Sequence, residues 1–483
     1  MLRAFTFLAV LLSSPFVRGA DEPKKPATPT KTAPAPQEPP ETVRLTVQPM
    51  AAPVPALKYQ LLPEVSEMNP GNPALGYLKS FGDETNFFYG KQWVEDQDKW
   101  SEMPLKDLPL KQISDWRFFL ASALKNADDA ARLDTPDWQI LSKLKSEGCG
   151  LRLSELGEMR RLSMVLKVRL RAEIAERHFD KALVTVKTIF AMSRHLCEHP
   201  TLVGNQVGIT ILQETAMGPL EEMLQQPGCP NLYWALSALP SPLLSIYKGM
   251  QGERLMFTPL LLPIDERTPM TDEQLQKVVD RFDELIALTG KISKMGDIRK
   301  SVNAKAKDEA RLTAARKQLS EAGFDPKKLK QFPPLQVILL NEMLAFRERR
   351  DDDMKAMMLP YWQIQSSLGV GGANEGENGQ DRRSLFVFLF PPDKARREQA
   401  RLEQRIALLR CVEALRMYAA DHDGQLPARF DDVPVPGPID PVSGMPFTYT
   451  LDGATATVRG TPVQREAWYT FYNFNAYEVT MKK

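Results

Sequence analysis

The sequence predicts a mainly α fold, with a multi-helix body of helical hairpins followed by a small C-terminal α/β module made of a long helix and a β-hairpin. Three observations support this prediction. Apolar residues recur at helical spacing through much of residues 57–368. Alternation of apolar and polar residues, which is typical of strands, is nearly absent before residue 440. Beyond that point the Asp452-Gly453 dipeptide separates two short strand-like segments.

Length, composition and charge are those of an ordinary globular protein. The chain has 483 residues, of which 43% are hydrophobic, so it can build two or three folded units. Its formal net charge is +1. A near-neutral chain has no overall electrostatic attraction to nucleic acid or to an anionic membrane, so we expect neither as a partner.

The first 20 residues have the pattern of a secretory signal peptide. Arg3 provides a positive charge, and residues 4–12 form an apolar run that is too short to span a bilayer. Val17 and Gly19 fit the small-residue positions before a cleavage site, which favours cleavage after Gly19, with Ala20 as the alternative. We therefore expect export to the periplasm or the extracellular space, with no transmembrane segment after cleavage. An uncleaved membrane anchor is the other interpretation.

Three further segments divide the chain. Residues 21–56 are rich in proline, threonine, alanine and lysine, and they predict a disordered tether that cannot bury enough apolar surface to offset its conformational entropy. Residues 369–383 are rich in glycine and asparagine and predict a flexible loop. Residues 384–390 form an apolar run that suits a buried strand or a docking segment. The helical domain is then 57–368, and the C-terminal module is 384–483.

Helical spacing is clearest over residues 179–198, where the apolar side chains share one face. Residues 177–178 predict the corner of a hairpin with the preceding helix. In the module, a helix at 393–420 precedes hairpin strands at 447–451 and 454–458, and residues 471–474 suit a last strand. The helices predicted for the body cover residues 73–81, 91–102, 109–132, 153–176, 179–198, 202–226, 241–257, 272–289, 302–322 and 334–358.

The end of the module helix and the segment after it carry a recognisable pattern. It consists of Tyr418, Asp421, Gly424 and Pro427, followed by Asp440, Pro441, Gly444, Pro446 and Tyr449. This pattern resembles the region after the long helix in the major pseudopilins of type II secretion. The resemblance implies a pseudopilin-like module and a calcium ion held by this region. The prepilin-peptidase site and the hydrophobic N-terminal helix of that family are missing from this sequence.

A second resemblance extends over most of the chain. Its matching segments are residues 57–63, 69–72, 230–236 and 359–362, together with the C-terminal module. They are similar to a family of uncharacterised exported proteins of planctomycete type. The resemblance implies export and this overall architecture, and it implies no chemistry.

Two histidines suggest a zinc site. If residues 195–199 are helical, His195 and His199 lie on one face at i, i+4, a spacing that zinc can use. Cys197 would lie on the opposite face, and His178 is a helix length away, about 25 Å at 1.5 Å per residue. Because zinc sites in proteins normally have three or four protein ligands, surface histidines at a helix end are the alternative that we favour.

The aspartates of the C-terminal turns are the candidates for a metal site. Asp421, Asp423 and Asp440 are potential calcium ligands, and Asp431 and Asp432 lie between them in the sequence. The alternative is that aspartate and glycine simply form turns here. No other cofactor is predicted.

No catalytic residue is assigned, because the common nucleophile, phosphate-binding and dinucleotide motifs are missing from the sequence. His422, between Asp421 and Asp423, is the best-placed histidine for a hydrolase. The basic stretch at 291–350 has no interleaved aromatic residues, which favours a solvated helical face over a nucleic-acid site. Pro230 to Trp234 and the Tyr361-Trp362 pair suit wedges between helices or the lining of a ligand groove.

The four cysteines are Cys149, Cys197, Cys229 and Cys411, and none forms a Cys-x-x-Cys pair. One or two disulfides would fit an oxidising compartment, and the pairing stays open. Taken together, the sequence favours a non-enzymatic interaction or scaffold protein of the cell envelope that binds a protein partner. An envelope hydrolase, with its site at a helix junction or near His422, is the alternative.

Overall fold

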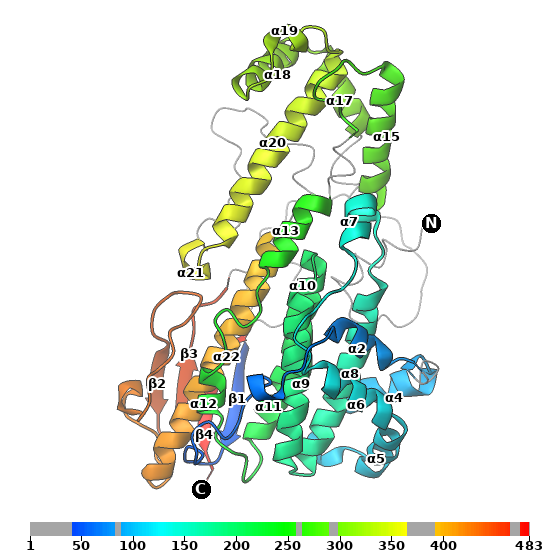
Figure 1. Cartoon of the computed structure of the whole chain (residues 1–483). Coiled ribbons are helices and arrows are strands. Elements are labelled where there is room, and N and C mark those ends of the chain that lie inside the picture. Colours follow the sequence, from blue (N-terminus) through cyan, green and yellow to red (C-terminus); the bar gives the residue numbers. More distant parts are fainter. Residues whose placement is uncertain are drawn as a thin grey trace, which may run out of the picture.

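The structure is a computed structural model of the chain. It describes residues 41–82, 88–256, 263–288, 298–364, 392–463 and 474–482. Helices dominate these residues and the strands form one small sheet, so the predicted mainly α fold with a small α/β module is confirmed (Figure 1). The predicted signal peptide, the first part of the tether, the loop at 369–383 and the apolar run at 384–390 lie outside the described residues.

A hairpin of two long helices forms the centre of the body. α8 (Ser154–Ala175) and α9 (Phe179–Cys197) meet at the predicted corner, where Arg177 has a φ of 58°. α10 (Leu202–Ile211) follows and continues through a π-helix, η4 (Leu212–Met217), into α11 (Gly218–Leu224). The smaller elements of the body are η1 (Val65–Glu67), α2 (Pro73–Lys79), α4 (Lys91–Glu102), η2 (Leu105–Asp107), α5 (Leu110–Phe119), α6 (Ala121–Ala130), α7 (Leu141–Glu147), η3 (Gly148–Gly150), α12 (Tyr233–Ser237) and α13 (Tyr247–Met256).

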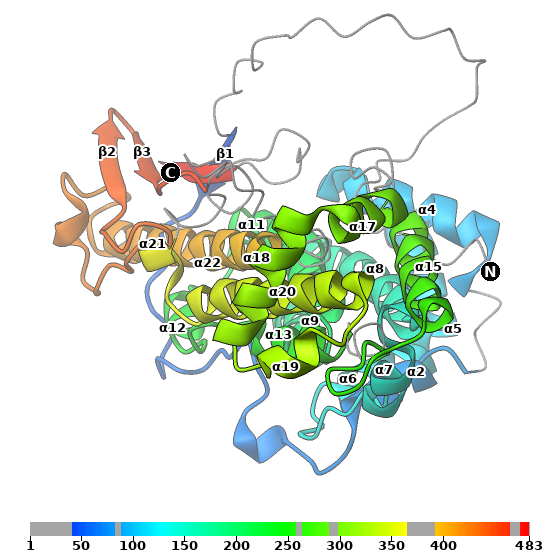
Figure 2. The same ribbon diagram turned by 90° about the horizontal axis from the view of Figure 1, so that it is seen from above.

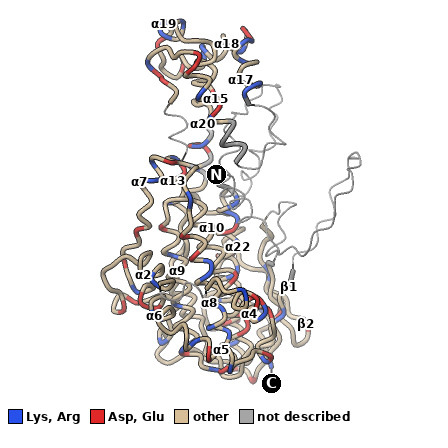
Figure 3. The backbone as a smooth tube through the Cα atoms, turned by 90° about the vertical axis from the view of Figure 1, so that its right-hand side faces the viewer, with Lys and Arg blue, Asp and Glu red and all other residues tan. Residues whose placement is uncertain are grey.

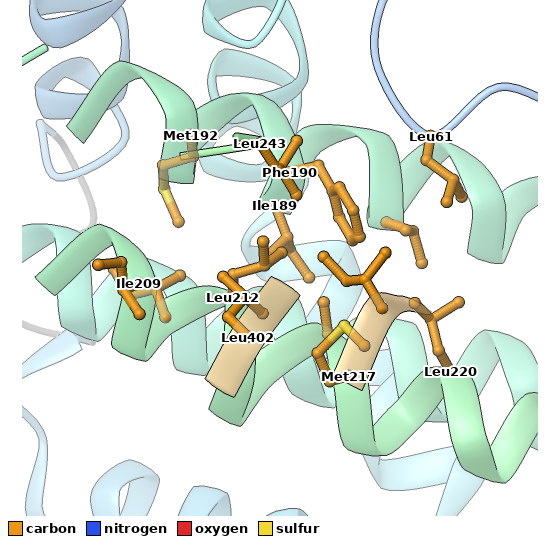
Figure 4. Packing of buried hydrophobic residues seen from close by; sticks show 14 of the residues in the cluster. Leu61, Ile189, Phe190, Met192, Ile209, Leu212, Met217, Leu220, Leu243 and Leu402 are labelled. Carbon is orange, nitrogen blue, oxygen red and sulfur yellow. The ribbon is translucent and has the colours of Figure 1, made fainter. Parts of the chain in front are cut away.

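The main hydrophobic core lies where α9, α10 and its continuation meet the C-terminal helix α22 (Pro392–Asp421). Figure 4 shows Ile189 and Phe190 of α9 close to Leu212 of η4 and Leu402 of α22. All four side chains are buried. The same core therefore contains residues from both the predicted helical domain and the predicted C-terminal module.

A second, separate core lies in what we call the arm, residues 263–288 and 298–357. Its helices are α15 (Asp272–Leu288), α17 (Ile298–Lys307), α18 (Glu309–Glu321), α19 (Pro326–Leu329) and α20 (Pro334–Met357). The arm extends away from the body, and α20 leads back to α21 (Tyr361–Ile364) beside α22 (Figures 1 and 2). The helix predicted at 302–322 is divided because the Asp308 carboxylate accepts hydrogen bonds from the backbone N–H groups of Ala310 and Arg311 and starts a new helix.

The basic residues of the arm are interspersed with acidic ones (Figure 3). Lys305 pairs with Glu342 at 2.7 Å, and Arg347 pairs with Glu266 at 3.0 Å. Because acidic partners neutralise these basic side chains, the pairs count against a stripe that binds phosphate groups.

The sheet contains β1 (Glu41–Val47), β2 (Thr448–Asp452), β3 (Thr455–Arg459) and β4 (Phe474–Met481), in the order β1-β4-β3-β2. The hairpin of β2 and β3 agrees with the predicted strands to within one residue at each end. A last strand, β4, is present from Phe474, and residues 471–473 of the predicted strand lie outside the described residues.

The prediction that residues 21–56 form a disordered tether is wrong for residues 41–50. β1 pairs in parallel with β4, and Leu45 and Val47 are buried on the face of the sheet that packs on α22. Beyond β1, the Met50 N–H donates to the Arg416 carbonyl at 3.0 Å. The sequence prediction failed because the partner strand is more than 400 residues away, and a single short strand carries little signal of its own.

No helix in the described part of the chain is long and apolar enough to cross a membrane.

Candidate functional site

His195 lies in the last turn of α9 and is buried, not on the surface as we expected. Its Nδ1 is 2.9 Å from the hydroxyl of Tyr77, and the indole N–H of Trp138 donates to its backbone carbonyl at 2.9 Å. Burial lowers the pKa of His195 to about 4. The imidazole is therefore neutral near pH 7 and belongs to the packing between α2 and α9.

His199 is also buried, and it lies beyond the end of α9, which stops at Cys197. The assumed i, i+4 helical relation to His195 is therefore wrong. The His199 Nε2 is 3.2 Å from Oε1 of Glu155, and its Nδ1 is 2.8 Å from Oγ1 of Thr201. Among the described residues, no group of three or more His, Cys, Asp or Glu side chains could hold a metal ion.

The three side chains Glu155, His199 and Thr201 have the order carboxylate, imidazole, hydroxyl. Oγ1 of Thr201 accepts a hydrogen bond from the Gly204 N–H at 3.1 Å and thereby caps α10. Its hydroxyl proton is then available to Nδ1 of His199, which leaves the ring N–H on Nε2, directed at Glu155. This is the polarity of a catalytic triad. Thr201 and His199 are fully buried, however, so no substrate reaches them in this conformation.

α13 packs unusually close to this corner. A Cβ atom on Gly249 would lie 2.0 Å from Oδ1 of Asn205, and one on Gly252 would lie 1.7 Å from the Pro200 carbonyl oxygen. The close approach brings Glu253 to the start of α10, where its carboxylate accepts from the Leu202 N–H at 3.1 Å. Burial raises the pKa of Glu253 to about 7. The corner is thus a rigid, buried polar cluster that joins α9, α10 and α13.

The three predicted calcium ligands differ in burial and do not share one environment. Asp440 is buried, and its carboxylate accepts four hydrogen bonds from protein donors within the module. Asp421 and Asp423 are exposed at the end of α22, where Asp423 has a φ of 51°. The donors to Asp440 are Gln404 Nε2, the Val442 N–H, Ser443 Oγ and the Thr461 N–H. The geometry thus gives Asp440 the role of ordering the turn, and calcium binding here stays an untested prediction.

His422 is exposed, and its ring stacks on that of Tyr418 with a centroid separation of 3.7 Å. Its Nδ1 lies 2.8 Å from the Tyr418 carbonyl oxygen, so Nδ1 is the donor of that bond. With Nδ1 held by a carbonyl, the ring is fixed against the last turn of the helix. The structure gives His422 a stacking role at the helix end and shows no bond from it to Asp421 or Asp423.

A group of apolar side chains is partly exposed where the arm meets the module. Trp362 of α21 lies against Gly444, since a Cβ atom there would be 2.9 Å from Cδ2 of the indole. Met445 follows Gly444, and Ile439 pairs with Pro446 in an isolated bridge. We call the following side chains the joint surface: Met358, Leu359, Trp362, Ile439 and Met445, which are 46 to 64% exposed.

Backbone contacts hold the joint surface in place. Arg396 of α22 donates to the Leu359 carbonyl at 2.8 Å, so α22 fixes the link between α20 and α21. Tyr361 is buried next to Trp362, as we expected for a wedge. The sequence predicts the same role for both aromatics, but the side chains of adjacent helix residues point about 100° apart. That angle is the signal that one of the two would face outward.

The described cysteines other than Cys149, namely Cys197, Cys229 and Cys411, are buried free thiols. Burial raises the pKa of Cys229 to about 12 and raises the pKa of the other two as well. They are therefore unreactive as nucleophiles in the folded protein.

No family model, curated protein or solved structure matches this chain.

Proposed function

We propose that this chain is an exported, non-enzymatic protein of the cell envelope that binds a protein partner through the joint surface. Export is proposed from the signal-like pattern of residues 1–20. The observation that carries the binding proposal is the position of Trp362, which is 46% exposed although its ring is fixed against Gly444.

The physical reason is the cost of leaving apolar surface in water. Large exposed apolar groups that lie together mark interaction sites more often than single exposed residues do. Tryptophan is also the side chain that most often dominates binding energy at protein interfaces, because it buries a large area with few rotatable bonds. A rigid tryptophan with methionine and isoleucine beside it suits the centre of such an interface.

The test is site-specific photo-cross-linking in cells. A photoreactive amino acid replaces Met445 in one variant and Val65 in a control. Val65 is 92% exposed but belongs to η1, outside the joint surface. We expect one dominant partner to be captured from position 445 and not from position 65. Equal capture from both positions, or none from position 445, contradicts the proposal.

A second candidate function, an envelope hydrolase, is favoured by one observation, the carboxylate–imidazole–hydroxyl order of Glu155, His199 and Thr201. The burial of Thr201 counts against it. A screen of ester, peptide and glycoside substrates with the full chain decides the matter. Activity that Thr201→Val removes would support a hydrolase at this corner, and activity that only His422→Ala removes would place it at the C-terminal turn.

A further inference from the structure

We propose that the partner bound at the joint surface supplies an extended strand that adds to the free edge of β2. This inference rests on the proposed function and names the kind of partner segment involved. It starts from the sheet order β1-β4-β3-β2, in which β2 is an edge strand with no described strand on its outer side.

β2 lacks the proline, lysine and β-bulge with which proteins often protect an edge, although it is short, with five residues. Four of its five residues are exposed and Tyr449 is half-buried. The strand contains no proline and no lysine, and its pairing with β3 runs from Thr448 to Asp452 without a bulge. Natural edge strands are commonly interrupted by such features because unpaired N–H and C=O groups accept another strand. Within the described residues, the outer edge of β2 therefore has no paired strand.

The joint surface leads directly into this edge. Only Pro446 and Phe447 lie between Met445 and the start of β2. Pro446 pairs with Ile439 in an isolated bridge. A strand that pairs with β2 and extends past Thr448 reaches Met445 and, next to it, Trp362 on Gly444. The main-chain bonds would give affinity, and the apolar side chains would give selectivity.

The side chains of β2 indicate the pattern of the partner strand. Tyr449 and Leu451 lie opposite the buried Val458 and Ala456, so they belong to the apolar face of the sheet. Leu451 remains 38% exposed at the edge. A partner strand would cover it with apolar residues at alternate positions.

The other face of β2 is polar and ends in an acidic group. Thr448, Thr450 and Asp452 alternate with the apolar positions and are exposed. An opposite charge placed directly across from Asp452 on a neighbouring strand is favourable. The partner segment is thus an extended strand with alternating apolar and polar residues and a basic residue opposite Asp452.

The opposite edge of the same sheet, at β4, already pairs with a strand of this kind. β1, whose residues Glu41–Val47 come from the opposite end of the chain, pairs in parallel with β4. Apolar Leu45 and Val47 alternate with Arg44 and Thr46, and Arg44 pairs with Glu478 at 2.8 Å. The proposed addition at β2 has the same pattern of alternation and cross-strand charge.

The test measures backbone amide exchange in β2 of the full chain with a synthetic peptide as the probe. The peptide alternates valine with threonine and ends in one arginine, and a control peptide has proline at its centre. We expect the first peptide to slow exchange of the β2 amides and the proline peptide to leave them unchanged. Equal effects of both peptides, or no effect of either, overturn the proposal.

Variants locate the binding edge. Leu451→Lys places a charge on the apolar side of the edge and is expected to weaken peptide binding about tenfold. Thr450→Lys is a second edge variant in case Leu451→Lys does not fold, and Val65→Lys is the matched control. Binding that both edge variants retain overturns the inference.

The outcomes separate this inference from the proposed function. Partner capture at Met445 without any peptide effect on β2 leaves the joint surface as the interface and removes strand addition. Protection of β2 by the peptide, with no capture at Met445, removes the proposed function. If the β2 amides already exchange slowly in the free chain, another segment of this chain occupies the edge. If they become slow only when the chain self-associates, a second copy occupies it. Either result overturns the proposal of a partner strand.

Discussion

The Glu413 carboxylate and the Arg416 guanidinium form an ion pair 2.8 Å long, and neither side chain is exposed to solvent. The guanidinium also donates to the carbonyl oxygens of Gln48 at 2.9 Å and of Cys229 at 2.8 Å. One side chain of α22 therefore joins the segment after β1 to the loop before α12. This contact explains why residues 48–50 follow a fixed path instead of belonging to the tether.

Replacing Arg416 alone tests the importance of this contact. Arg416→Met leaves the buried Glu413 charge without its ion-pair partner, a change that typically costs about 3–5 kcal/mol of unfolding free energy. The double variant Glu413→Leu with Arg416→Met removes both charges, so we expect it to lose less. Urea denaturation of the two variants measures the difference. Equal losses would show that the charge pair is not what stabilises this region.

β1 provides a second test of the fold. Leu45 is buried between the sheet and the body, so Leu45→Ala is expected to cost about 2–5 kcal/mol, as for other buried leucines. Thr46→Ala, at the neighbouring exposed position, is the control and should change stability by less than about 0.5 kcal/mol. If residues 41–47 were part of a disordered tether, neither variant would alter the urea midpoint.

The helices of this protein could largely be predicted from local pattern, and the reason is physical. α4 covers Lys91–Glu102, as expected, because the boundaries of a helix depend on nearby residues. Asp308, which starts α18, is a local cap that could have been recognised from its residue type. β1 could not be recognised in this way, because its partner β4 lies at the other end of the chain.

The candidate sites were harder to predict, because burial is a property of the tertiary structure. His195 and His199 have the spacing of metal ligands, but Tyr77 and Glu155, which come from distant segments, bond to Nδ1 of His195 and Nε2 of His199. Thr201, two residues after His199, bonds to the other nitrogen of that ring. The joint surface combines residues from two regions that are about 80 positions apart in the sequence. The contact of Trp362 with Gly444 brings them together.

Glu253 should make stability depend on pH. Its pKa is raised from 4.5 to about 7 by burial, so the folded state binds this proton more tightly than the unfolded state. The stabilisation is complete below pH 4.5 and is lost as the pH rises through about 7, with a magnitude of about 3 kcal/mol.

Comparison with Glu253→Gln isolates this effect. The glutamine keeps an acceptor for the Leu202 N–H but carries no charge, so the variant should match the wild type below pH 4.5 and exceed its stability at about pH 8. Urea unfolding of both proteins below pH 4.5 and at about pH 8 measures the difference in their unfolding free energies. A variant that is less stable than the wild type at both pH values would contradict the assignment.

Gly444 and Gly453 form a matched pair for testing the support of Trp362. Both have a positive φ, 72° and 57°, so alanine strains the backbone at either position, by about 1–3 kcal/mol. Only at Gly444 would the new methyl group meet the indole, whereas nothing lies within 4 Å of the position at Gly453. We expect Gly444→Ala, and not Gly453→Ala, to shift the Trp362 indole resonance and to weaken partner binding. Identical spectra for the two variants would show that Gly444 does not support the tryptophan.

The most direct test of the central claim is the dissociation constant of the cross-linked partner for the wild type, Trp362→Ala and Val65→Ala. If the joint surface is the interface, Trp362→Ala should lose at least about 2 kcal/mol of binding free energy, or about 30-fold in affinity, while the folded structure persists. Val65→Ala, which removes an even more exposed apolar side chain outside the joint surface, should bind as the wild type does. An unchanged dissociation constant for Trp362→Ala would contradict the claim that the partner binds at the joint surface.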